Sequence, residues 1–295
     1  MTERILDVSR EPARLAVRNR SLLLQSDGRE ATIPFGDIAA VSVSHPCVTF
    51  TRAALAGLAR AGCGFVVCDE SSRPVGMLLP LDSHSIQTER LRRQAEVSLP
   101  TKKRLWKQLV SAKIRQQGRL LERLHGDERG LLDLAGKVRS GDKGNLEARA
   151  SRRYWPALFQ DRSFRRNPGL EDQNRYLNYG YAILRAAVAR ALCACGLHPS
   201  LGLHHHNRYN SFCLADDLVE PLRPLVDERA CRLLGERGPD APLDRPAKEM
   251  LLGIVDVRLE VAGESRQLFD AVARMCFSLV AALEGREKGL LIPEY

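Results

Sequence analysis

The sequence predicts an α+β protein, in which a small β-rich N-terminal domain precedes a larger all-α C-terminal domain. Over residues 1–80, apolar residues occur in short, partly alternating runs separated by turn residues, which is the pattern of β-strands. Over residues 88–295, apolar residues recur three or four positions apart, which is the spacing of helices. Residues 81–87 form a short linker, and 295 residues suffice for two domains with cores.

Turn residues divide the N-terminal domain into its elements. Strands are expected at 4–9, 13–19, 21–28, 30–35, 37–44, 62–70 and 74–80. The dipeptides at 19–20 (Asn-Arg) and 27–28 (Asp-Gly) favour tight hairpin turns. Either Thr49 or Thr51 is expected to cap the one helix of this domain, which ends at Gly62.

The C-terminal domain is expected to be helical throughout. Helices are predicted at 87–99, 100–124, 127–138, 145–159, 171–196, 216–235, 245–261 and 265–285. In the second of these, leucine and isoleucine form an apolar stripe. The basic side chains of that helix are expected on its other faces: Lys102, Lys103, Lys107, Lys113, Arg115 and Arg119. Asn145 is a favourable N-cap, which places Glu147 in the first turn of its helix.

The positive charge of the chain is concentrated in one block. The whole sequence has a net charge of +9, but residues 89–190 alone contain 24 basic and 11 acidic residues. A basic block in an otherwise slightly acidic chain favours a polyanionic partner, with nucleic acid first. The alternative is a solvated, lysine-rich helical surface without a partner.

Neither membrane insertion nor secretion is expected. The sequence contains no run of 18 apolar residues, and its first fifteen residues lack the apolar segment of a signal peptide. The eight cysteines include no CxxC pair, so free thiols in a reducing cytoplasm are favoured over disulfides or a zinc site.

The most informative stretch is residues 198–224. Three consecutive histidines at 204–206 precede an acidic cluster, in which Asp217 and Glu220 are three positions apart and share a helical face. Imidazole and carboxylate groups on a loop-to-helix segment favour a divalent-metal site. The alternative is that the acidic residues only cap a helix and that the histidines form a solvated loop.

Three separated motifs carry a resemblance to a known family. They are NLEARASRRYW at 145–155, LGLHHHNRYNSF at 201–212 and ADDLVEPLRP at 215–224. In this order they resemble the signature of the CRISPR-associated spacer-acquisition integrases, the family of CRISPR-associated protein one. The β-then-α plan is also similar, so the resemblance covers essentially the whole chain. The HNRYNSF segment at 206–212 most resembles the branch that accompanies single-protein (type II) effector nucleases.

The resemblance implies a site and a reaction. Glu147, His205 and Glu220 match the family's catalytic metal ligands, with Asp217 as a supporting or alternative ligand and His204 as the main competitor of His205. The implied metal is Mg²⁺ or Mn²⁺. The implied reaction is transesterification, in which the 3′-hydroxyl of a short captured DNA attacks a phosphodiester at the boundary of a repeat.

The resemblance also implies partners. They are double-stranded DNA (the captured spacer and the repeat array), a second copy of the chain, and a small ferredoxin-like CRISPR-associated protein. Residues 1–80 are the expected dimerisation surface. Two other functions remain open from the residues alone: a stand-alone nuclease selective for branched DNA, and a non-catalytic scaffold that binds nucleic acid.

Overall fold

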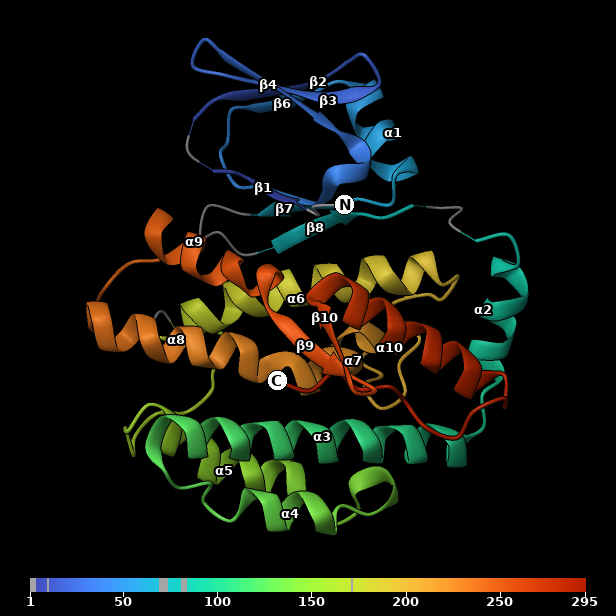
Figure 1. The fold of residues 1–295 in the computed structure, drawn as a ribbon, viewed down its shortest axis with the longest axis vertical. Helices are drawn as coiled ribbons and strands as arrows, with labels where there is room; N and C mark the ends of the chain where they lie inside the picture. The colour runs from blue at the N-terminus through green and yellow to red at the C-terminus, as the bar shows by residue number, and fades with distance from the viewer. Residues whose placement is uncertain (1–3, 10, 69–73, 81–83, 171) are drawn as a thin grey trace.

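A strand-rich N-terminal part is followed by a mostly helical part (Figure 1), as the sequence predicts. The structure is a computed structural model that describes residues 4–9, 11–68, 74–80, 84–170 and 172–295. The N-terminal strands are β1 (Arg4–Val8), β2 (Ala13–Arg18), β3 (Ser21–Ser26), β4 (Arg29–Pro34), β5 (Ile38–Val43), β6 (Val48–Phe50), β7 (Gly64–Cys68) and β8 (Pro74–Leu78). They form two four-stranded sheets, ordered β1-β5-β7-β8 and β4-β3-β2-β6. Strand β6, which pairs with β2, was not expected.

The predicted hairpin turns are present. Asn19 and Arg20 both have positive φ, at 50° and 59°, and they join the antiparallel strands β2 and β3. This is the turn geometry that matches the twist of two paired strands. Of the two candidate caps, Thr51 caps α1 (Arg52–Arg60), because its Oγ1 accepts a hydrogen bond from the backbone N–H of Ala54 at 3.2 Å. Helix α1 packs into the core that the two sheets share.

The helices of the C-terminal part largely match the predicted ranges. They are α2 (Gln87–Glu96), α3 (Leu99–His125), α4 (Leu131–Lys137), α5 (Leu146–Leu158), α6 (Asn174–Ala194), α7 (Cys213–Val219), α8 (Arg223–Arg237), α9 (Arg245–Leu252) and α10 (Leu268–Leu283). The 3₁₀ turn η3 (Glu220–Leu222) joins α7 to α8 without a break. The predicted helix at 216–235 is therefore present, although it begins three residues earlier, at Cys213, and is tightened at one turn.

The C-terminal part is not all helical, and the predicted helix at 245–261 is wrong beyond Asp256, where the 3₁₀ turn η4 (Gly253–Asp256) ends. The chain instead forms a hairpin of β9 (Arg258–Val261) and β10 (Glu264–Gln267). Leu259 and Val261 are buried while their neighbours are exposed, which is a period of two. Four residues are too few to separate this alternation from helical spacing by sequence.

Helix α3 is the central element of the helical part. Its 27 residues span about 40 Å at 1.5 Å per residue. Ser98 caps its start, and Gly126, with φ of 69°, ends it. In Figure 1, α4 and α5 lie on one side of α3, and α7 and α8 lie on the other. Elements that are distant in the sequence therefore meet along α3. Among the described residues, no helix is both long and apolar enough to cross a membrane.

Candidate active site

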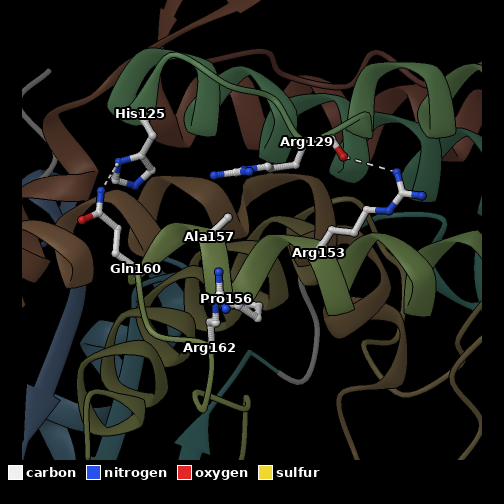
Figure 2. A pocket seen from close by; sticks show the side chains of 7 residues that line it. All are labelled: His125, Arg129, Arg153, Pro156, Ala157, Gln160 and Arg162. Atoms are coloured by element: carbon white, nitrogen blue, oxygen red, sulfur yellow. Dashed lines mark hydrogen bonds between the residues drawn. The ribbon is translucent and has the colours of Figure 1, made fainter.

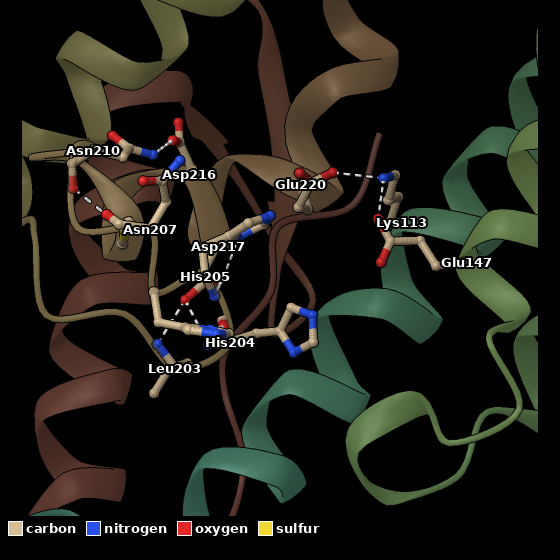
Figure 3. Close-up of polar contacts among 12 residues, drawn as sticks. Lys113, Glu147, Leu203, His204, His205, Asn207, Asn210, Asp216, Asp217 and Glu220 are labelled. Atoms are coloured by element: carbon tan, nitrogen blue, oxygen red, sulfur yellow. Dashed lines mark hydrogen bonds and ion pairs between the residues drawn. The ribbon is translucent and has the colours of Figure 1, made fainter.

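The predicted site residues come together from three separate segments. Glu147 lies in α5, His205 in the loop between α6 and α7, and Glu220 in the 3₁₀ turn η3 (Figure 3). We call residues 195–212 the histidine loop. Helix α3 adds Lys113, which the sequence analysis did not include in the site. The site is thus built on helices except for the histidine.

Glu147 is positioned by a neighbouring carboxylate. Asp142 accepts hydrogen bonds from the backbone N–H groups of Leu146 (2.9 Å) and Glu147 (3.0 Å) at the start of α5. The expected N-cap, Asn145, makes no capping hydrogen bond with its side chain and instead adopts a left-handed conformation. That part of the prediction is wrong, because the chain turns tightly before α5 and brings Asp142 over the helix end. Glu147 remains in the first turn, as expected.

Glu220 is buried between two cations. Its side chain is only 4% exposed, and its Oε1 lies 2.9 Å from Nη2 of Arg223. Its Oε2 lies 2.6 Å from Nζ of Lys113. Burial alone would raise the pKa of Glu220, but the charges of Arg223 and Lys113 outweigh burial and lower the pKa to about 2. Glu220 is therefore a carboxylate at neutral pH.

Lys113 joins the two glutamates. Its Nζ lies 2.7 Å from Oε1 of Glu147 as well as 2.6 Å from Oε2 of Glu220. Burial would lower the pKa of Lys113, but the negative charges of Glu220 and Glu147 raise it above its ordinary value. Lys113 was expected on an outer face of its helix, and this is wrong: the residue is only 7% exposed. The two carboxylates thus flank one buried ammonium group.

Asp217 organises the histidine loop. Its carboxylate is fully buried and accepts hydrogen bonds from the backbone N–H groups of Leu203 (2.6 Å), His204 (3.0 Å) and His205 (3.2 Å). The same carboxylate lies 2.7 Å from Nδ1 of His205. Both oxygens of Asp217 are therefore engaged in holding the loop, which is the role of a supporting residue.

The structure separates the three histidines. His205 donates from Nδ1 to Asp217, so the neutral ring keeps its lone pair on Nε2, the arrangement usual for a metal-binding histidine. The hydrogen bond to Asp217 raises the pKa of His205, against the opposite effect of burial. His204 stacks on Trp106, with ring centroids 4.2 Å apart and planes 2° apart. His206 is exposed and contacts the backbone of His204.

Two further features fix the backbone of the histidine loop. Gly202 leaves no room for a side chain, since a Cβ there would lie 2.2 Å from the carbonyl oxygen of His205. Gln94 of α2 donates to the carbonyl oxygens of His198 (2.8 Å) and Leu201 (3.1 Å), and it accepts from the N–H of His198 (2.9 Å). The first helix after the strand-rich part therefore holds the start of the loop.

The donor set fits a hard divalent cation. Two carboxylates and one neutral imidazole nitrogen suit Mg²⁺ or Mn²⁺. Oε2 of Glu220 is buried, and the cation next to it is the ammonium group of Lys113, 2.6 Å away. As they stand, no three described His, Cys, Asp or Glu side chains form a group that could hold a metal ion. The ammonium group of Lys113 lies between the two carboxylates.

A basic hollow lies on the surface formed by the end of α3 and by α5. It has a volume of about 560 Å³ and is lined by Arg129, Arg153, Arg162, His125 and Gln160, together with an alanine and a proline (Figure 2). All of these residues belong to the basic block at 89–190. Its lining includes no carboxylate among the residues that the structure describes. Such a hollow suits the phosphates of a nucleic-acid backbone.

The protein has a strand-rich part and a helical part, and the helical part carries two glutamates, a histidine and a basic surface. This combination is typical of an enzyme that processes nucleic acids. The family model described as CRISPR associated protein Cas1 matches residues 6–241, which is more than half of the chain. The chain therefore belongs to the Cas1 family, and the resemblance carried by the three motifs is confirmed.

Individual relatives agree with this assignment. The chain is 36% identical over 284 residues to the CRISPR-associated endonuclease Cas1 of Neisseria meningitidis serogroup C (strain 8013), covering 95% of this chain and 93% of that protein. This relative fits the predicted type II branch. Among solved structures, a casposase bound to integration product is similar over 100% of this chain and 94% of its own, with a TM-score of 0.81 and 18% identity. A Cas6-RT-Cas1–Cas2 complex is similar over 97% of this chain and 35% of its own, with a TM-score of 0.74 and 18% identity. Both structural similarities support the fold.

Proposed function

We propose that this Cas1 family member is a metal-dependent DNA integrase of CRISPR adaptation, which inserts short foreign DNA into a repeat array. Family membership supports the coarser part of this proposal, a CRISPR-associated nuclease or integrase. One observation supports the finer part. Glu147 and Glu220 lie on either side of the ammonium group of Lys113, and His205 is close enough to Glu220 to help lower its pKa. A role limited to helix capping would not bring these groups together.

The residues have distinct roles in this proposal. Glu147, Glu220 and Nε2 of His205 would hold Mg²⁺ or Mn²⁺. When bound, the ion would lower the cost of forming an alkoxide nucleophile and neutralise charge that develops on the attacked phosphate. Asp217 would orient His205 and fix its tautomer. Arg223 would hold Glu220 in its ionised form.

The proposed reaction exchanges one phosphodiester for another. The 3′-oxygen of the captured DNA forms a bond to a phosphorus of the repeat strand, and the bond from that phosphorus to its previous 3′-oxygen breaks. The proton of the attacking hydroxyl leaves to solvent, and a proton returns to the departing 3′-oxygen. No nucleoside triphosphate is needed because the number of phosphodiesters is unchanged. With water as the nucleophile, the same site would hydrolyse DNA.

The proposed partners are double-stranded DNA, a second copy of the chain, and a small ferredoxin-like protein. Basic residues of the block at 89–190, including those of the arginine-lined hollow, would contact the DNA backbone. The two N-terminal sheets would supply the dimer surface. Every cysteine whose side chain is described is a free thiol, which suits the cytoplasm as the place of action.

The direct test is a strand-transfer assay with site variants. We expect Glu147→Gln, His205→Ala and Glu220→Gln each to reduce joining of a 3′-hydroxyl duplex to a repeat-containing plasmid by at least about 10²-fold, a loss typical for removal of a catalytic group. A matched control is Glu96→Gln, an exposed carboxyl at the end of α2. DNA binding should be nearly unchanged, and the assay uses variants that are shown to be folded by circular dichroism. Joining that survives in all three site variants would refute the site.

A second comparison separates an integrase from a stand-alone nuclease. The plasmid is incubated with the wild-type protein and duplexes that end in either a 3′-hydroxyl or a 3′-deoxy group. Joined products that require the 3′-hydroxyl support integration. Cleavage of branched DNA without joining, even when the small partner protein is added, would instead support the nuclease function.

A further inference from the structure

The most unusual group in the site is the buried ammonium of Lys113. Its side chain is only 9% exposed, and it forms ion pairs with both glutamates that are proposed as metal ligands. We propose that Lys113 is a resident cation in the metal position: its ammonium holds Glu147 and Glu220 in place in the metal-free protein, and it must move away when a divalent ion binds. Metal binding would then be an exchange of cations. This inference rests on the proposed metal site.

Distances show why the two cations exclude each other. The Nζ atom lies 2.7 Å from a Glu147 oxygen and 2.6 Å from a Glu220 oxygen. A Mg²⁺ ion binds oxygen at about 2.0–2.1 Å, so an ion bound to both of these oxygens would occupy the space that Nζ now fills. The ion and the ammonium also repel each other, because both are positive and the site is largely buried.

Glu220 offers no oxygen that avoids the exchange. Its Oε1 pairs with Arg223 at 2.9 Å, and its Oε2 pairs with Lys113 at 2.6 Å. An ion that binds Glu220 therefore meets one of these two cations at either oxygen. Arg223 is held more firmly, because its guanidinium also stacks over the ring of Tyr181, 4.5 Å from the centroid.

Lys113 is the cation that is able to leave. Its only ion-pair partners among the described residues are Glu147 and Glu220, and its four-carbon side chain is flexible. Glu147 is 26% exposed, so the site opens towards solvent on that side. The ammonium can therefore follow this opening while α3 stays in place. It would then lie next to an incoming DNA phosphate, where a positive charge is favourable.

The position of Lys113 on α3 supports a specific role rather than a chance contact. Trp106, seven residues earlier, lies on the same face of α3 and contacts the rings of both His204 and His205. One face of one helix thus packs against the histidine loop and neutralises the two carboxylates. A structural lysine could neutralise them equally well from the side, without filling the space between them.

The first test is calorimetric titration of the full-length protein with MnCl₂ in the absence of DNA. The variants are Lys113→Met, which keeps the length but removes the charge, and Lys113→Arg, which keeps the charge. The control is Lys107→Met, an exposed position on the same helix. We expect Lys113→Met to bind Mn²⁺ at least about tenfold more tightly than wild type. Lys113→Arg should bind no more tightly than wild type, and Lys107→Met should match it. Unchanged or weaker binding by Lys113→Met would overturn the exchange.

A second test needs no variant and covers the case in which Lys113→Met does not fold. Wild-type protein is labelled with an amine-reactive N-hydroxysuccinimide ester, with and without MnCl₂, and the labelled lysines are quantified by mass spectrometry. We expect labelling of Lys113 to increase several-fold with Mn²⁺, while labelling of Lys107 stays constant. Labelling of Lys113 that stays the same or decreases would overturn the proposal.

Failure of the exchange and failure of the metal site give different results. If wild type binds Mn²⁺ and Glu147→Gln abolishes that binding, the metal site stands whatever Lys113→Met does. If neither wild type nor Lys113→Met binds Mn²⁺ at millimolar concentration, the metal site and the exchange are both wrong. If wild type binds and Lys113→Met binds no more tightly, only the exchange is wrong.

Discussion

Replacing Asp217 by asparagine is the most direct test of how the histidine loop is held. The change keeps the size of the side chain but turns one acceptor oxygen into an NH₂ donor. In the structure, the two carboxylate oxygens accept three backbone N–H groups and face Nδ1 of His205. An asparagine has one oxygen for these four donors, so its NH₂ group must face at least one backbone N–H.

The size of the effect follows from the bonds that are lost. A hydrogen bond to a charged group contributes about 1.5–3 kcal/mol, and an unsatisfied buried donor costs about 1–3 kcal/mol. The asparagine oxygen is expected to take the place of the oxygen that accepts from Leu203 and His204, at 2.6 and 3.0 Å. The NH₂ group then replaces the oxygen that lies 3.2 Å from the backbone nitrogen of His205 and 2.7 Å from its Nδ1. Losing that oxygen should therefore destabilise the fold by about 3 kcal/mol, since partial relaxation of the loop offsets some of the loss.

The assay is urea unfolding of Asp217→Asn against wild type, followed by Mn²⁺ titration of the folded variant. Stability should fall by about 3 kcal/mol. Mn²⁺ affinity should fall about 10–100-fold, because His205 loses the partner that fixes its tautomer. Asp133→Asn is the control, since the ion pair of Asp133 among the described residues is an exposed one with Lys137, which contributes about 0–1 kcal/mol. A loss below about 1 kcal/mol for Asp217→Asn, together with unchanged Mn²⁺ affinity, would refute this account of the loop.

Three further predictions concern the loop, the buried glutamate and the basic hollow. Gly202→Ala should destabilise the protein and weaken Mn²⁺ binding, because the new Cβ would lie 2.2 Å from the carbonyl oxygen of His205. An unchanged melting temperature and Mn²⁺ affinity would contradict this close contact at Gly202. Glu220 has its pKa lowered to about 2, so the stability from its ionised form is complete above the ordinary pKa and is lost as pH falls towards 2. The free energy of urea unfolding should therefore be higher for wild type than for Glu220→Gln, and this difference should be larger at pH 5 than at pH 3. An equal difference at the two pH values would contradict the lowered pKa of Glu220. Arg153→Ala should reduce the slope of log DNA affinity against log salt by about 1, whereas Arg245→Ala, an arginine paired with Glu249, should not.

The order of most strands and helices could be predicted because each of these elements has a local signal, whereas the site of Glu147, His205 and Glu220 was predicted from family motifs. Hairpin turns at 19–20 and 27–28 are encoded by residues that tolerate positive φ. The β9–β10 hairpin could not be separated from a helix, since each of its strands has only four residues. Its register depends on tertiary packing as well as on the local sequence.

Lys113 and Asp142 were missed for different physical reasons. Lys113 is three and four positions from Val110 and Leu109, two buried residues of the same helix, and this spacing was a usable signal for burial. A lysine was nevertheless expected to be exposed, because buried lysines are rare and the partners of this one come from distant segments. Asp142 caps α5 across a tight turn, and only the folded backbone shows that its carboxylate reaches Leu146 and Glu147.

Helix α2 connects the two parts of the molecule mechanically. It follows β8 after a short segment, and its Gln94 makes three hydrogen bonds to the backbone of the histidine loop, while Arg90 donates to the carbonyl oxygen of Cys195. A change in angle between the strand-rich and helical parts would therefore move the start of this loop. The start of the loop is thus tied to α2 at Gln94, whereas His205 is tied to α7 at Asp217, so such a change in angle would strain the loop between these two attachments.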